Sequence, residues 1–218
     1  MPFDGKHARN TWGGTRNRAD RTSDALPLAK ARSIIAAAYQ AKAIGLPFNR
    51  FITVHWERAG IADNHAALAT ARLVKLASDW AASKGVRILW AWVRENDAGD
   101  GSKGSHVHIL LHCPARLPIG RMWQRWLRRI TARPYQRGTI KSERIGRTLN
   151  AHDGAPIVYC QNLDVVLAYL CKGVHSHDGA TSGLPRTESG GRVIGKRAAW
   201  SQCLGLNSRV LTTGFSRA

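Results

Sequence analysis

The spacing of apolar residues along the chain predicts four helices. The first segment is rich in alanine, and in the second the apolar residues recur every three or four positions. The third alternates arginine with apolar residues, and the fourth begins at a capping residue and ends before a glycine. The expected helices cover residues 28–44, 63–83 and 120–131, and run from Asn162 or Asp164 to Lys172.

Five other segments have the composition or the alternation typical of β-strands: residues 51–56, 86–93, 106–112, 138–145 and 156–160. Residues 86–93 are apolar on both faces, which indicates a central strand. Turn-forming residues separate that segment from residues 106–112, so the two are expected to pair as an antiparallel hairpin. The pattern as a whole predicts an α+β fold with a mainly antiparallel central sheet and flanking helices.

Charge narrows the range of partners. The chain has 33 Lys and Arg against 14 Asp and Glu, a formal net charge of +19. Such an excess favours a polyanion, and no basic amphipathic helix of the membrane-binding kind is present, so nucleic acid is the expected partner. Residues 1–25 are expected to be a flexible basic arm, 26–175 the folded domain, and 176–218 a basic C-terminal extension.

The termini and the cysteines predict a cytoplasmic protein. The first residues lack the apolar stretch of a signal peptide, and no run of about 18 apolar residues could span a membrane. The four cysteines have neither CxxC pairing nor zinc-finger spacing, so free thiols in a reducing compartment are expected.

A His-x-His pattern marks a candidate metal site. Side chains alternate along a strand, so His106 and His108 share one face while Val107 and Ile109 share the other, which is suited to the core. We expect the two imidazoles to lie on the open face of the sheet, where they can bind one cation. His112 points the same way but lies too far along the strand to join them.

A carboxylate from the preceding strand is the expected third ligand. The hairpin should return the chain so that Glu95 lies close to His106, with Asp97 and Asp100 in the loop as alternatives. Two imidazoles and one carboxylate leave open positions on the ion, as a catalytic site requires.

A tyrosine and a lysine on the last predicted helix supply a second candidate feature. Tyr169 and Lys172 are three residues apart and therefore neighbours on one face. A nearby ammonium stabilises a phenolate and can bind a phosphate, so Tyr169 is a candidate nucleophile. Tyr159 is its main rival.

These motifs, taken in order, resemble the HUH endonuclease superfamily, and within it the single-tyrosine rolling-circle replication initiators of plasmids and phages. The resemblance rests on strand residues 51–54, then His106 and His108, then Tyr169 and Lys172. It implies a ferredoxin-like or RRM-like core and a Mg²⁺ or Mn²⁺ ion bound by the histidines and a third ligand. It also implies nicking and rejoining of single-stranded DNA through a 5′-phosphotyrosine.

The resemblance leaves other functions open. The same motifs are typical of HUH tyrosine transposases of the REP-associated or insertion-sequence type. A DNA-binding module without catalytic activity would need only the charge and the sheet. The implied substrate is single-stranded DNA or an origin hairpin. The chain has no GxxxxGK[ST] loop, so any helicase would be a separate host protein.

Basic residues outside these motifs are candidate DNA contacts. The expected helix over residues 120–131 also contains Trp123 and Trp126, which we interpret as core residues rather than as base-stacking platforms. The candidate contacts are Arg121, Arg125, Arg128 and Arg129 on this helix, and Lys196 and Arg197 in the C-terminal extension.

Overall fold

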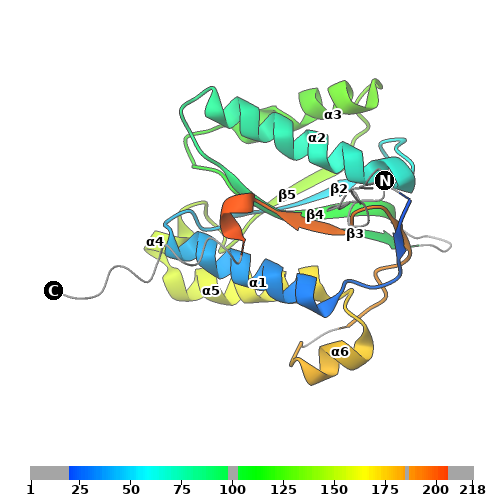
Figure 1. Ribbon diagram of the computed structural model, residues 1–218. Helices are drawn as coiled ribbons and strands as arrows, with labels where there is room; N and C mark the ends of the chain where they lie inside the picture. Colours follow the sequence, from blue (N-terminus) through cyan, green and yellow to red (C-terminus); the bar gives the residue numbers. More distant parts are fainter. Residues whose placement is uncertain (1–19, 98–102, 185–186, 206–218) are drawn as a thin grey trace, which may run out of the picture.

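A five-stranded antiparallel sheet forms the centre of the molecule. The computed structural model describes residues 20–97, 103–184 and 187–205 (Figure 1). The central strand is β4, which pairs through main-chain hydrogen bonds with β2 on one side and β3 on the other. In order across the sheet, the strands are β5 (Ile140–Arg144), β2 (Arg50–His55), β4 (Gly104–His112), β3 (Leu89–Asp97) and β7 (Ala198–Trp200).

Helices cover both faces of this sheet. Figure 1 shows α2 (Asp63–Ala82) and α3 (Trp123–Thr131) on one face, and α1 (Leu28–Ala43) and α5 (Pro156–Cys171) on the other. The predicted α+β class, with an antiparallel sheet and flanking helices, is therefore confirmed. The remaining elements are short: β1 (Thr22–Ser23), η1 (Ile119–Arg121), α4 (Ala151–Gly154), α6 (Ser176–Thr181), β6 (Val193–Ile194) and η2 (Gln202–Leu204).

The side chains of β4 alternate as expected. Val107 and Ile109 belong to the core beneath α2 and α3, whereas Leu110 belongs to the core beneath α1 and α5. His106 and His108 share the face of Leu110, which we expected to be open. That expectation is wrong, because helices cover this face as well and every residue of β4 is buried.

The helix α5 is longer than predicted and replaces a predicted strand. It begins at Pro156, so residues 156–160 form its first turns and not a strand. A short apolar run does not distinguish a strand from a buried helix. Proline suits the first turn of a helix because it lacks the N–H that would find no partner there.

The C-terminal segment is part of the fold. β7 pairs with β3 at one side of the sheet, and β6 pairs with β1. The expectation that residues 176–218 lie outside the core is therefore wrong for residues 187–205. Of the expected N-terminal arm, residues 20–25 are described and include β1, while residues 1–19 lie outside the described part of the chain.

None of the helices in the described ranges combines the length and the apolar composition needed to cross a bilayer.

Candidate metal centre

The register of the β3–β4 hairpin brings three potential metal ligands together. Glu95 lies directly opposite His106, and both face α5. The Glu95 Oε2 atom is 3.3 Å from His106 Nε2 and 3.7 Å from His108 Nε2. The potential ligand atoms of the three residues all lie within 4.8 Å of one another, so this cluster could hold a metal ion.

The hydrogen bonds of the histidines suit a cation at this point. His106 Nδ1 is 2.7 Å from the carbonyl oxygen of Gly104. Because a carbonyl only accepts, Nδ1 must donate, and in the neutral ring Nε2 then presents a lone pair to the Glu95 carboxylate. Two acceptors face each other there, an arrangement that a positive ion between them would stabilise.

The burial of the three potential ligands also supports a cation at this point. The exposed fractions of Glu95, His106 and His108 are 0%, 1% and 3%. Both carboxylate oxygens of Glu95 and the Nε2 atom of His108 are buried without a hydrogen-bond partner in the described structure. Buried polar atoms normally have partners, so these orphaned atoms and their nitrogen and oxygen chemistry fit a divalent ion.

A lysine ammonium also neutralises the Glu95 carboxylate. Lys172 Nζ lies 3.1 Å from Glu95 Oε2 and 3.2 Å from Glu188 Oε2. Burial opposes ionisation of Glu95, but the neighbouring imidazoles of His106 and His108 and the charge of Lys172 outweigh it, so the pKa of Glu95 lies well below its usual range. Burial likewise disfavours the Lys172 ammonium, but the two carboxylates raise its pKa above the ordinary value.

The candidate nucleophile lies beside this cluster. The ring of Tyr169 is half-buried, and its centroid is 5.1 Å from that of His108. Lys172 Nζ lies 4.8 Å from the centroid of the Tyr169 ring. The last turn of α5 and the residue that follows it thus present a phenol and an ammonium to the side of the histidine pair.

Three residues of β2 complete the surroundings and were missed in the sequence. Thr53 Oγ1 lies 2.9 Å from His108 Nδ1, and the ring of Phe51 stacks on His108 with centroids 5.3 Å apart. His55 lies opposite His106, with ring centroids 5.7 Å apart. Alternation along the predicted strand over residues 51–56 puts all three side chains on one face, and this signal could have identified them.

His55 is a neutral imidazole at the edge of the cluster. Burial lowers its pKa to about 4, and the positive charges of neighbours that include Arg58 and Lys103 lower it further. Glu188 was also missed, and no local pattern in the sequence connects its segment with the hairpin.

The rivals and alternative ligands lie elsewhere. Tyr159 is fully buried at the other end of α5 and donates a hydrogen bond to the carbonyl of Phe48. Asp97 pairs with Gly104 at the end of β3 and does not join the cluster, and Asp100 lies outside the described residues. His112 Nδ1 lies 2.7 Å from the carbonyl of Pro47, away from the other two histidines.

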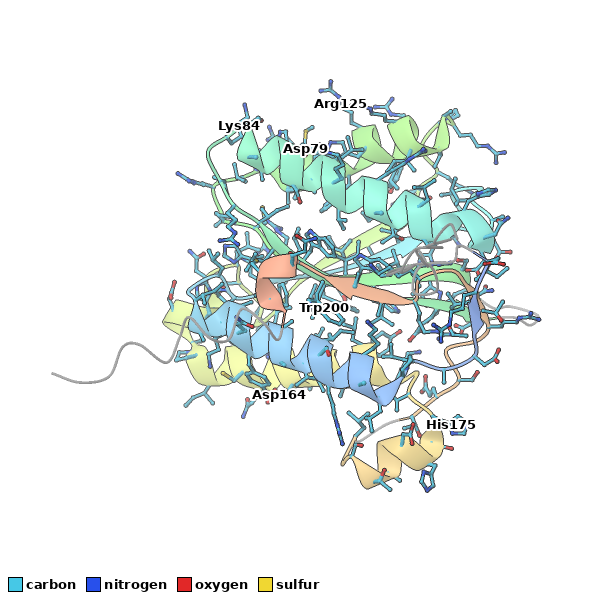
Figure 2. All side chains as sticks on the ribbon, viewed as in Figure 1. Asp79, Lys84, Arg125, Asp164, His175 and Trp200 are labelled. Carbon is cyan, nitrogen blue, oxygen red and sulfur yellow. The ribbon has the colours of Figure 1, made fainter. Side chains whose placement is uncertain are left out.

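The predicted DNA contacts do not gather around the cluster. The arginines of α3 are exposed, but α3 covers the opposite face of the sheet; Figure 2 shows Arg125 on its outer side. Lys196 is exposed as well. The expected role of Arg197 as a surface contact is wrong, because its side chain is buried and donates to the carbonyls of Ser23 and Gly191. Trp123 and Trp126 are core residues, as interpreted.

Comparisons of the chain with protein-family models, with curated proteins and with solved structures found no match.

Proposed function

We propose that this protein nicks and rejoins single-stranded DNA in a metal-dependent reaction, with Tyr169 as the nucleophile. One observation carries the proposal: a half-buried phenol lies beside a buried carboxylate–imidazole cluster, 5.1 Å from His108 between ring centroids. The resemblance to HUH endonucleases supports the same reaction. A role in starting rolling-circle replication of a plasmid or phage rests on that resemblance alone.

The chemistry is a transfer of one phosphodiester. Tyr169 Oη attacks the phosphorus, a new P–O bond forms, and the bond to the 3′-oxygen breaks. The phenol loses its proton and the leaving oxygen gains one, so the products are a 5′-phosphotyrosine and a free 3′-hydroxyl. Attack by a 3′-hydroxyl on the phosphotyrosine reverses the reaction and joins the strand.

The residues around Tyr169 have separate parts in this proposal. The Lys172 ammonium lies over the phenol ring, 4.8 Å from its centroid, where its positive charge is close to the site of the scissile phosphate in this proposal. Glu188 and Glu95 keep that ammonium charged and in position. A Mg²⁺ or Mn²⁺ ion held by Glu95, His106 and His108 would supply positive charge against the phosphate oxygens. Two imidazoles among three ligands favour Mn²⁺ over Mg²⁺, which prefers oxygen.

An end-labelled oligonucleotide pool tests the proposal. Single-stranded DNA of random sequence is incubated with the protein and Mn²⁺, and products are separated under denaturing conditions. We expect a protein adduct with label at the DNA 3′ end and none with label at the 5′ end, because the 5′ fragment leaves with its free hydroxyl.

Two variants identify the nucleophile. Tyr169→Phe should abolish the adduct and leave salt-sensitive DNA binding intact. Tyr39→Phe is the matched control, since Tyr39 is 45% exposed on α1, and it should form the adduct normally. An equal adduct in Tyr169→Phe would exclude Tyr169 and direct attention to Tyr159. Binding without any adduct in the wild type would favour the module without catalytic activity.

A further inference from the structure

A cavity lies at the end of the sheet nearest His55. It has a volume of about 290 Å³ and is formed by the turn after β2 and by the segment that joins α3 to β5. This is close to the lower limit of small-ligand pockets, about 300 Å³. Its wall consists of Glu57, Arg58, Ala59, Gly60, Leu127, Thr131, Arg133, Pro134, Tyr135, Gln136 and Thr139. None of the metal-centre residues lines it, so it is a separate feature, here named the arginine pocket.

Two exposed arginines, Arg58 and Arg133, each extend from one wall of the pocket toward a glycine on the opposite segment. Arg133 Nη1 lies 2.0 Å from the point where a Cβ on Gly60 would stand, and Arg58 Nη1 lies 2.7 Å from the corresponding point on Gly138. Both glycines have a positive φ, 74° and 82°, and only the absence of a side chain admits the guanidinium groups. Within the described residues, neither guanidinium has a hydrogen bond or an ion pair, so both remain available to a phosphate.

The inner wall offers a hydroxyl that has no partner. Thr139 is 2% exposed, and its Oγ1 atom is buried without a hydrogen bond in the described structure. Tyr135, which is half-buried, contributes an aromatic side chain to the wall of the same cavity. Glu57 is the acidic residue of the wall, and its carboxylate lies against Gly104 at the far end of the hairpin. Arginines, aromatic rings and hydroxyl groups are the side-chain groups that recognise the phosphate and the base of a nucleotide, and this wall contains all three.

The pocket adjoins the metal centre through β2. The main-chain N–H of His55 donates to the carbonyl of Thr139 at 2.8 Å, and the His55 ring lies 5.7 Å from that of His106 between centroids. The arginine pocket therefore lies next to the edge of the metal centre. We infer that the arginine pocket binds one nucleotide of the single-stranded DNA substrate, its phosphate at Arg58 and Arg133 and its base at Thr139 and Tyr135. This inference deepens the proposed function and rests on it for the class of ligand.

Binding in the presence of a chelator tests the pocket without any cleavage. The probe is a fluorescent single strand of random sequence, longer than the roughly 4–16 nucleotides that single-strand-binding folds cover. Arg58→Gln with Arg133→Gln should weaken binding at least roughly tenfold more than Arg72→Gln with Lys84→Gln. The control pair removes the same charge from exposed positions on and after α2, with Lys84 labelled in Figure 2.

Thr139→Val provides the sharper readout. It removes the unpartnered hydroxyl, so the stability of the free protein should stay equal or rise. Binding of the probe should nevertheless weaken roughly two- to tenfold, and binding of an abasic oligomer of the same length should not change. Equal losses in the two arginine pairs, or unchanged probe binding in Thr139→Val, would overturn the inference. Because no metal is present, these results are independent of whether Tyr169 forms an adduct.

Discussion

At the scale of single residues, Glu95 holds the cluster together electrostatically. It is fully buried, and its Oε2 atom is within 3.7 Å of two imidazoles and a lysine ammonium. In the absence of a metal ion, the ammonium of Lys172 is the main charge that compensates this carboxylate. A divalent ion would add a stronger compensation, and the folded state should become more stable in its presence.

Thermal unfolding with and without Mn²⁺ measures this effect. A concentration about a hundred times the dissociation constant stabilises the folded state by about 2.7 kcal/mol, which corresponds to about 5–10 °C in Tm for a chain of this size. In Glu95→Gln we expect most of the shift to disappear. Glu143→Gln, an exposed position on β5, is the control and should retain it. A full shift in Glu95→Gln would exclude Glu95 as a ligand.

A second prediction at this scale concerns the hydrogen bond between α1 and α5. The Tyr39 hydroxyl donates to Asp164, and this bond, with burial and the negative charge, raises the pKa of Tyr39 to about 12. Since the folded pKa lies above the unfolded value, the stabilising contribution is complete below about pH 10 and is lost as the pH rises to about 12. Ultraviolet titration of phenolate should show one tyrosine shifting toward pH 10 in Asp164→Asn. An unchanged titration would contradict the assignment.

At the scale of elements, the first turn of α2 connects three strands. The Asp63 carboxylate accepts hydrogen bonds from Arg94 on β3, from Ser105 on β4 and from the main-chain N–H of Ile194 on β6. The Arg94 side chain has no exposed surface, so Asp63 supplies the main compensation for a buried charge. Burial lowers the pKa of Arg94 and the Asp63 carboxylate opposes this effect.

Removing this carboxylate should destabilise the fold severely. Asp63→Ala leaves the Arg94 guanidinium buried without its anionic partner, with main-chain carbonyls such as that of Ile194 as its remaining acceptors. We expect a loss of about 3–5 kcal/mol in the free energy of unfolding. Asp79→Ala on the same helix removes an exposed pairing with Lys75 and should change it by about 0.5 kcal/mol or less. Urea unfolding of the two variants provides the comparison. Similar losses in both would show that the buried pair contributes no more than the exposed one.

The sequence allowed prediction of the long elements but not of the short ones. Period and composition were sufficient for α1, α2 and the β3–β4 hairpin, because each extends over many residues with one consistent pattern. β6 and β7 contain only two and three residues, which is too few to show a period, and their partners are distant in sequence. The burial of His106 and His108 was not predicted, because two polar residues that alternate with apolar ones along a strand usually indicate a face exposed to solvent.

The residues of the candidate site also fall into two groups, those that a local sequence pattern connects and those that only the packing of the chain brings together. Glu95, His106 and His108 could be associated from hairpin geometry, and Tyr169 with Lys172 from helical spacing. Contact between these two groups depends on how α5 packs on the sheet, which no local pattern encodes. Glu188 approaches Lys172 only because residues 187–205 return to the sheet.

At the scale of the whole molecule, the candidate site and the most basic helix lie on opposite faces. Figure 2 shows Arg125 and Asp164 on the two outer surfaces, with the sheet between them. The metal cluster faces α5, whereas the exposed arginines of α3 point away from the other face. If the protein acts on DNA as proposed, its net charge of +19 would attract DNA to the surface as a whole, and the arginines of α3 would have no direct access to the reacting phosphate.

This separation predicts that affinity and chemistry respond differently to loss of charge on α3 and on the adjoining η1, which contains Arg121. Replacing Arg121, Arg125, Arg128 and Arg129 with glutamine should weaken binding of single-stranded DNA and reduce the slope of log affinity against log salt by at most about 3. At saturating DNA, adduct formation should continue at the wild-type rate, because the groups around Tyr169 are unchanged. The control removes the same charge at Arg72, Lys75, Lys84 and Arg87, all exposed on α2 or just after it. A slower reaction at saturation in the α3 variant alone would mean that the DNA passes around the edge of the sheet, and that both faces hold it during the reaction.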